Sequence, residues 1–213
     1  MEEKELELEG IINSIVDETF KVLKMVFQNQ KEGKPCRIDN LDSRIDSRIV
    51  FPRYSTLYRD GETRISEQEL RFVFVEQFNK NNDVKEHNLF YSVETPTELK
   101  YSFKDKTNPK PDANGQSAMV DLAIHNENYE RIALIEFKAL NPDEFCYKKD
   151  FCKLTAEWEN DERLMTFFVM ILKNSDKGTE INVKKKMSAK HDHTHFRCYD
   201  LSKGEDITKK IIP

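Results

Sequence analysis

The chain has 213 residues, a usual length for one domain, and its 38% hydrophobic residues fall in periodic runs that indicate a folded core. Its 34 Lys+Arg against 39 Asp+Glu give a formal net charge of −5, which excludes a protein that coats nucleic acid through bulk positive charge. The acidic start of the chain lacks the regions of a signal peptide, and the longest apolar run, residues 167–172, is far too short to span a membrane, so we expect a cytoplasmic protein.

The first predicted element is a long amphipathic helix over residues 6–30. Its apolar side chains recur at spacings of three and four residues, which places them on one face. They are Ile12, Ile15, Val16, Phe20, Leu23 and Phe27. We therefore interpret residues 1–65 as an N-terminal helical segment that packs on, or extends, a core formed by residues 66–213.

The second predicted element is a helix that begins at Ser66. Glu69 follows Ser66 by three residues, which is the pattern of a capping box. One face of this helix is predicted to hold Leu70, Val73, Phe74, Gln77 and Phe78. A turn is expected after it, at residues 79–83.

Short strands are predicted next, followed by a helix and further strands. The first group of strands covers residues 89–94, 99–103, 118–125 and 132–139, and residues 126–130 form a short polar hairpin connection. The helical pattern after Pro142 runs through Phe145, Phe151, Leu154 and Trp158, and the last strands are expected at residues 166–172 and 195–201. This order predicts a mixed α/β domain with helices packed on a central sheet.

Two of the predicted strands carry charged residues where an apolar core is expected. Asp121 interrupts the strand at 118–125, and Glu136 and Lys138 interrupt the strand at 132–139. Because side chains alternate along a strand, Glu136 and Lys138 share one face. Pairing of the two strands as a hairpin would let the Asp121 and Glu136 carboxylates bind one divalent cation, with Lys138 beside it. Mg²⁺ prefers such oxygen ligands and stabilises charge on phosphate, and a nearby lysine orients or deprotonates the attacking water, so the pattern predicts phosphodiester hydrolysis.

The arrangement of Asp121, residues 122–135 and Glu136-Phe-Lys138 resembles the bipartite signature of the PD-(D/E)XK nuclease superfamily. This is the fold of many restriction endonucleases and of repair or recombination nucleases. The resemblance covers about residues 66–173, and Val120 replaces the proline of the family's first motif. It implies a restriction endonuclease-like mixed sheet flanked by helices, to which the N-terminal helical segment is added.

The resemblance also implies roles for individual residues. Asp121 and Glu136 would bind Mg²⁺, with Mn²⁺ as a substitute, and Lys138 would be the catalytic lysine. The family often adds an acidic ligand from its first helix, and Glu69 takes that place here, with Glu67 and Glu76 as alternatives. The capping box explains Glu69 equally well without any metal.

Two groups of lysines are expected to contact a nucleic-acid backbone, because few acidic residues interrupt them. They are Lys148, Lys149 and Lys153, and Lys184, Lys185 and Lys186. A solvated helix face explains each group equally well. His191, His193 and His195 alternate along the chain, but zinc needs a fourth convergent ligand, so we interpret them as exposed strand or loop residues.

The sequence therefore predicts a Mg²⁺-dependent nuclease that acts on DNA rather than RNA, with a role in restriction, defence or DNA processing. The alternative is a non-catalytic nucleic-acid-binding or assembly module of the same fold, which uses its first helix to bind a partner. A weaker alternative is a phosphohydrolase of small nucleotides. A homodimer is a further expectation, by analogy with nucleases that cut both strands.

Overall fold

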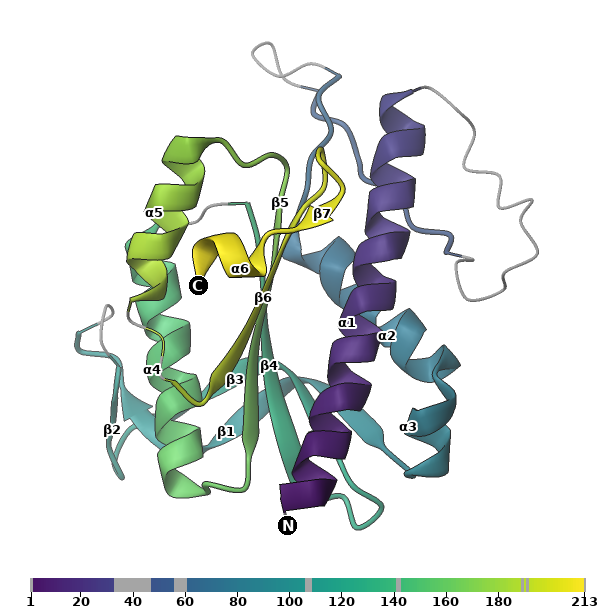
Figure 1. Cartoon of the computed structure of the whole chain (residues 1–213). Helices are drawn as coiled ribbons and strands as arrows, with labels where there is room; N and C mark the ends of the chain where they lie inside the picture. Colours follow the sequence, from purple (N-terminus) through teal and green to yellow (C-terminus); the bar gives the residue numbers. More distant parts are fainter. Residues whose placement is uncertain are drawn as a thin grey trace.

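A seven-stranded mixed sheet forms the centre of the computed structural model, and helices cover both of its faces (Figure 1). The structure describes residues 2–32, 47–55, 61–105, 109–140, 143–188, 190 and 192–212. The strand order is β2-β1-β3-β4-β5-β6-β7. This architecture confirms the predicted mixed α/β class.

The elements follow the predicted order, with short elements added between them. The helices are α1 (Glu2–Lys31), α2 (Glu67–Lys80), α3 (Asn82–Glu86), α4 (Glu144–Asn160), α5 (Lys177–Met187) and α6 (Thr208–Ile211). The strands are β1 (Phe90–Ser102), β2 (Lys110–Pro111), β3 (Gln116–His125), β4 (Arg131–Ala139), β5 (Met165–Leu172), β6 (Thr194–Asp200) and β7 (Glu205–Asp206). The sequence patterns do not predict α3, α5, α6, β2 or β7.

The first three long strands form an antiparallel unit, β1-β3-β4, and β5 and β6 continue the sheet parallel to β4. The two segments predicted at residues 89–94 and 99–103 are one strand, β1. Its register with β3 shifts between Pro96 and Lys100, which explains why the sequence pattern breaks there. Strands β1 and β2 thus lie on one side of the β3-β4 pair, and β5, β6 and β7 lie on the other. This order places β3 and β4 near the middle of the sheet.

The predicted turn at residues 79–83 is largely helical. The α2 helix continues to Lys80, and α3 begins at Asn82. Asn81 joins the two helices, because its side chain accepts a hydrogen bond from the Val84 N–H, with 3.1 Å between the donor and acceptor atoms. An N-cap of this kind lets a new helix begin directly after the previous one ends.

The α1 and α2 helices cover one face of the sheet (Figure 1). All six apolar residues of the predicted α1 stripe are buried, in the same core cluster as the predicted apolar residues of α2 and as Phe137 on β4. Residues 47–55, between the two helices, are not helical. Although α1 has 30 residues, neither it nor another helix in the described part of the chain is apolar enough to cross a membrane.

The α4 and α5 helices cover the opposite face (Figure 1). The α4 helix confirms the helical pattern predicted after Pro142, and its Tyr147, Phe151 and Leu154 are buried. The Phe151 ring lies 4.7 Å from the Phe168 ring of β5, measured between centroids. Glu136 and Lys138 point to this face, whereas Phe137 points to the other, as the strand alternation predicts.

Candidate active site

Asp121, Glu136 and Lys138 line one cavity of about 450 Å³ between the sheet and α4. Leu122 of β3 pairs with Ile135 of β4, so the register continued by one residue brings Asp121 opposite Glu136. The predicted pairing of these two strands is confirmed. The cavity therefore brings together the three residues that carry the predicted chemistry.

The Asp121 carboxylate is fixed by the neighbouring strand. The Phe137 N–H donates a hydrogen bond to Asp121 Oδ2, with 2.8 Å between N and O, just beyond the last backbone pair of β3 and β4. Arg71 of α2 lies on the other side, with its Nη1 3.9 Å from Asp121 Oδ1. Asp121 thus has one anchored oxygen and one oxygen that faces a positive charge.

Glu94 of β1 is a further acidic residue of the cavity that the sequence analysis does not identify. It lies between Val93 and Thr95, which pair with β3 on either side of Asp121, and it forms an ion pair with Arg71. Its φ of 46° is in the left-handed region, which is unusual for a residue other than glycine. Such backbone strain occurs frequently at functional sites.

Glu136, Lys138, Asp150 and Lys153 form a buried cluster of two carboxylates and two ammonium groups in the wall of the cavity, which we call the charge cluster. The Nζ atoms of Lys138 and Lys153 each lie 2.9 Å from a different oxygen of Asp150. Lys153 also forms an ion pair with Glu136. Their exposed fractions range from 2% for Glu136 to 7% for Lys138. Because an unpaired buried charge is very costly, the alternation of charges explains how the fold accommodates the cluster.

The charge cluster also sets the protonation of its members. Burial raises the pKa of Glu136 well above its usual range, and the nearby Asp150 charge adds to this effect. Burial lowers the pKa of Lys138, but the charges of Asp150, Glu136 and Glu67 outweigh burial and raise this pKa overall. The pKa of Lys153 is raised in the same way by Glu136 and Asp150. Lys138 is therefore an ammonium ion at neutral pH, which suits charge stabilisation and orientation of water rather than proton abstraction.

The carboxylates fit a magnesium ion by donor type. Mg²⁺ is usually held by one or two carboxylates, with water and substrate phosphate completing an octahedral shell, and Asp121 and Glu136 supply such a pair. Within the described ranges of the chain, no group of three or more His, Cys, Asp or Glu side chains is arranged to hold a metal ion.

Glu69, the expected acidic ligand from the first helix of the motif, serves as a helix cap. Its carboxylate accepts a hydrogen bond from the Ser66 N–H, with 2.9 Å between N and O, and lies 3.4 Å from Arg64 Nη2. Among the described residues that line the cavity, α2 contributes Glu67 instead. Glu67 lies 3.5 Å from Lys138 Nζ, and burial raises its pKa. Glu76, the other alternative, does not line the cavity.

The lysines predicted to contact nucleic acid have different surroundings. Lys148 is exposed on α4 and forms an ion pair with Glu144, and Lys149 lines the cavity. Lys153 is not on the surface, because it is buried in the charge cluster. On α5, Lys184 and Lys185 are exposed, and the Lys186 Nζ lies 5.2 Å from the centre of the Tyr147 ring.

His193 and His195 stack on aromatic rings away from the cavity. The His193 ring lies 3.8 Å from the Trp158 ring, and the His195 ring lies 4.7 Å from the Phe167 ring, measured between centroids. His195 Nδ1 also lies 3.1 Å from a carboxylate oxygen of Glu9. His191, which the sequence groups with them, lies outside the described residues.

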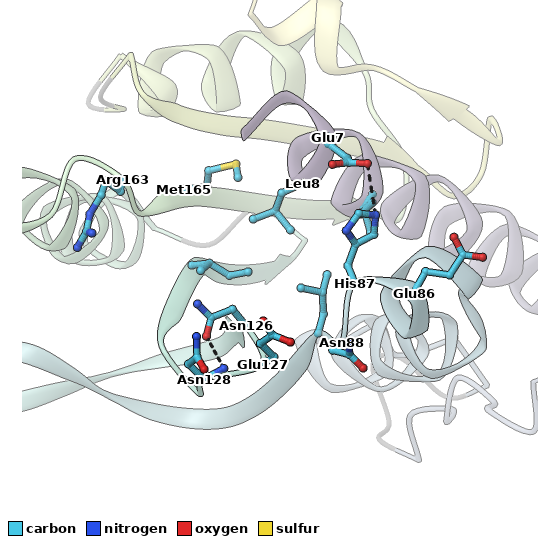
Figure 2. A pocket seen from close by; sticks show the side chains of 13 residues that line it. Glu7, Leu8, Glu86, His87, Asn88, Asn126, Glu127, Asn128, Arg163 and Met165 are labelled. Carbon is cyan, nitrogen blue, oxygen red and sulfur yellow. Dashed lines mark hydrogen bonds and ion pairs between the residues drawn. The ribbon is translucent and has the colours of Figure 1, made fainter. Parts of the chain in front are cut away.

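A larger cavity of about 650 Å³ lies near the opposite end of β4, where Ile132 and Met165 contribute to its wall (Figure 2). It is bounded by the start of α1, by the α3 region and by the β3-β4 hairpin. Its ion pair, between Glu7 and His87 at 3.4 Å, involves two exposed side chains. The described residues that line this cavity include none of the predicted site residues and no buried cluster of charges, so the smaller cavity is the candidate active site.

Sequence reasoning missed the inward position of Asp150 and Lys153, although a signal was present. Asp150 follows Tyr147 by three residues and precedes Leu154 by four, so it belongs to the apolar stripe of α4. Lys153 lies three residues after Asp150 on the same face. A charged pair within a buried stripe is costly, which is the same signal that identified Glu136 and Lys138 on their strand.

The chain was compared with protein-family models, with curated proteins and with solved structures, and none of them matches it. Its function is therefore inferred from the chemistry of the cavity.

Proposed function

We propose that the chain is a metal-dependent nuclease that hydrolyses phosphodiester bonds, with DNA rather than RNA as its substrate. The observation that carries this proposal is the convergence of Asp121, Glu136 and Lys138 in one cavity on two adjacent strands. The succession of α2, β1, β3, β4, α4 and β5 supports the finer proposal of a restriction endonuclease-like fold. A role in restriction, defence or DNA processing would follow from this activity.

The residues of the cavity have separate tasks in the proposed reaction. A divalent cation held by Asp121 and Glu136 would supply Lewis-acid stabilisation of the phosphate and would lower the pKa of a bound water. Asp121 is already oriented by the Phe137 N–H, so little reorganisation is needed when it binds a ligand. The Lys138 ammonium, held at 2.9 Å by Asp150, stabilises the negative charge that develops on the phosphate.

Positive charge near the cavity supports a polymeric substrate. Lys149 lines the cavity, and Lys148 on the same helix is exposed. Lys184 and Lys185 add exposed positive charge on α5, which lies next to α4. A backbone that follows these two helices would pass the cavity while its phosphates meet lysines.

A cleavage assay tests the proposal. Supercoiled plasmid, linear duplex, single-stranded DNA and RNA would be incubated with Mg²⁺, Mn²⁺ or EDTA. We expect metal-dependent cutting of DNA that falls at least about 100-fold in Glu136→Gln and Lys138→Met. Glu159→Gln is the control, because Glu159 is exposed on α4 away from the cavity. Equal cutting by the wild type and Glu136→Gln would rule out this active site.

One observation favours a second candidate, a non-catalytic nucleic-acid-binding or assembly module. The charge cluster is balanced without a metal, because its two carboxylates already have two ammonium partners. If the protein binds DNA in a salt-dependent way but does not cleave it in the presence of Mg²⁺ or Mn²⁺, this candidate is favoured. Metal-dependent turnover would dismiss it.

A further inference from the structure

The Lys153 ammonium has an oxygen acceptor for each of its hydrogens. It forms an ion pair with Glu136 Oε1, lies 2.9 Å from Asp150 Oδ1 and donates to the Met119 carbonyl at 2.7 Å. A lysine ammonium has three donors and no acceptor, so its hydrogen-bonding capacity is used completely. Lys153 is only 3% exposed, so its ammonium is a fixed, buried part of the site and not a mobile group on the surface.

The same acceptors would suit a hard metal ion. Two carboxylates and a backbone carbonyl are the oxygen ligands that divalent cations of the Mg²⁺ and Ca²⁺ kind prefer. Many phosphodiester-cleaving sites hold two such ions about 3.5–4 Å apart, which stabilise the attacking and the leaving oxygens. Glu136 lines the cavity beside Asp121, while its Oε1 contacts Lys153. The ammonium thus lies where a second cation bound to Glu136 would lie.

The Asp150 carboxylate fixes the position of the Lys153 ammonium relative to Lys138. Its Oδ2 binds Lys138 at 2.9 Å, while its Oδ1 binds Lys153. Asp150 therefore binds the two ammonium groups through separate oxygens of one carboxylate. The helix α4 supplies Asp150 and Lys153 three residues apart, so both side chains come from the same rigid surface.

We propose that the Lys153 ammonium is a built-in cation that takes the place of a second metal ion, so that the site binds one divalent cation rather than two. This inference rests on the proposed function, because it concerns the metal held by Asp121 and Glu136. The second positive charge that other nucleases take from solution is here part of the chain. Lys153 is a positioning residue in this scheme, since it acts through Glu136.

Metal stoichiometry tests the inference without any measurement of activity. Mn²⁺ binding to the full chain would be measured by equilibrium dialysis and by electron paramagnetic resonance of the unbound ion. We expect one Mn²⁺ per chain for the wild type and two for Lys153→Ala, in which Glu136, Asp150 and the Met119 carbonyl become available. Lys153→Arg keeps a cation at this place and should bind one. Lys148→Ala removes an exposed lysine from the same helix and should also bind one.

The double variant K153M/D150N guards against loss of folding. It removes the ammonium together with one of the carboxylates that the ammonium neutralises, and it should bind one Mn²⁺ because a ligand of the second ion is gone. Thermal unfolding, with and without Mn²⁺, reports whether each variant is folded. We expect Mn²⁺ to raise the midpoint of Lys153→Ala more than that of the wild type, because the metal replaces the missing charge.

The outcomes separate this inference from the proposed function. Two Mn²⁺ ions in the wild type would overturn the inference and leave the nuclease proposal standing. No bound Mn²⁺ in the wild type would overturn both. One ion in the wild type and one in a folded Lys153→Ala would also overturn the inference. If Lys153→Ala stays unfolded with and without Mn²⁺, the stoichiometries of the wild type and the double variant decide: one ion in each supports the inference, and two in either overturns it.

Discussion

Buried polar residues of α4 connect the helix to two different parts of the sheet. Asp150 and Lys153 bind Glu136 and Lys138 of β4, as described above. Glu157, one turn further along, is 1% exposed and binds β1 instead. Its carboxylate accepts hydrogen bonds from the Glu98 and Leu99 N–H groups, both at 3.0 Å. These donors lie within the register shift of β1, so Glu157 satisfies backbone groups that the sheet leaves unpaired.

Replacement of Glu157 by alanine should destabilise the fold strongly. The substitution leaves two backbone donors without their acceptor and removes the ion pair with Arg131, whose Nη2 lies 3.3 Å from the carboxylate. Loss of one member of a buried charged pair costs about 3–5 kcal/mol, and we expect a decrease of this size in the free energy of unfolding. Urea denaturation followed by circular dichroism would measure it. Glu159→Ala, at an exposed position two residues away, should change stability by less than about 0.5 kcal/mol. A Glu157→Ala change of similar size to this control would contradict the assigned role.

The sequence could identify site residues that are charged but stand within an apolar strand. Asp121, Glu136 and Lys138 interrupt apolar strands, and the structure brings all three into one cavity. Glu69 could not be separated from Glu67 in this way. The two lie two residues apart in the first turn of a helix, and only the direction in which α2 meets β4 decides which one reaches Lys138.

Whole helices and strands could be predicted where their buried apolar residues form a clear pattern along the sequence. The α1 stripe, the α2 face and β5 are buried almost throughout their predicted positions. The α5 helix escaped prediction because its buried residues are only Val183 and Met187, which is too few to mark a face. The α3 and α6 helices have 5 and 4 residues, and one turn carries no period.

The first turn of α2 gives a matched pair of variants. Glutamine can replace glutamate in a capping box, so Glu69→Gln should retain the cap and leave Mn²⁺ affinity unchanged. Glu67→Gln removes a negative charge from the cavity wall, and we expect Mn²⁺ to bind about fivefold more weakly, because one charge near the cation contributes about 1 kcal/mol. Isothermal titration calorimetry would measure both affinities. A loss confined to Glu69→Gln would instead assign the metal-ligand role to Glu69.

The two faces of the sheet belong to one continuous structure, although different helices cover them. The α1 side packs on Ile135 and Phe137, and the α4 side packs on Leu134, which directly precedes Ile135 on the same strand. Figure 1 shows α1 and α4 on opposite sides of this sheet. Loss of packing on one face should therefore destabilise the other face as well, because both depend on β4.

A substitution in α1 can test this coupling, because Trp158 is the single tryptophan of the chain and lies on α4. Leu23 is fully buried in α1, so Leu23→Ala should lower the free energy of unfolding by about 2–5 kcal/mol. If the chain unfolds as one unit, Trp158 fluorescence and far-ultraviolet circular dichroism will show the same shifted midpoint in urea. Leu6→Ala, at a position 67% exposed on the same helix, should shift neither probe appreciably. A Trp158 transition that stays at the wild-type midpoint in Leu23→Ala would show that α1 belongs to a separate unit, and α1 could then be removed without loss of the candidate active site.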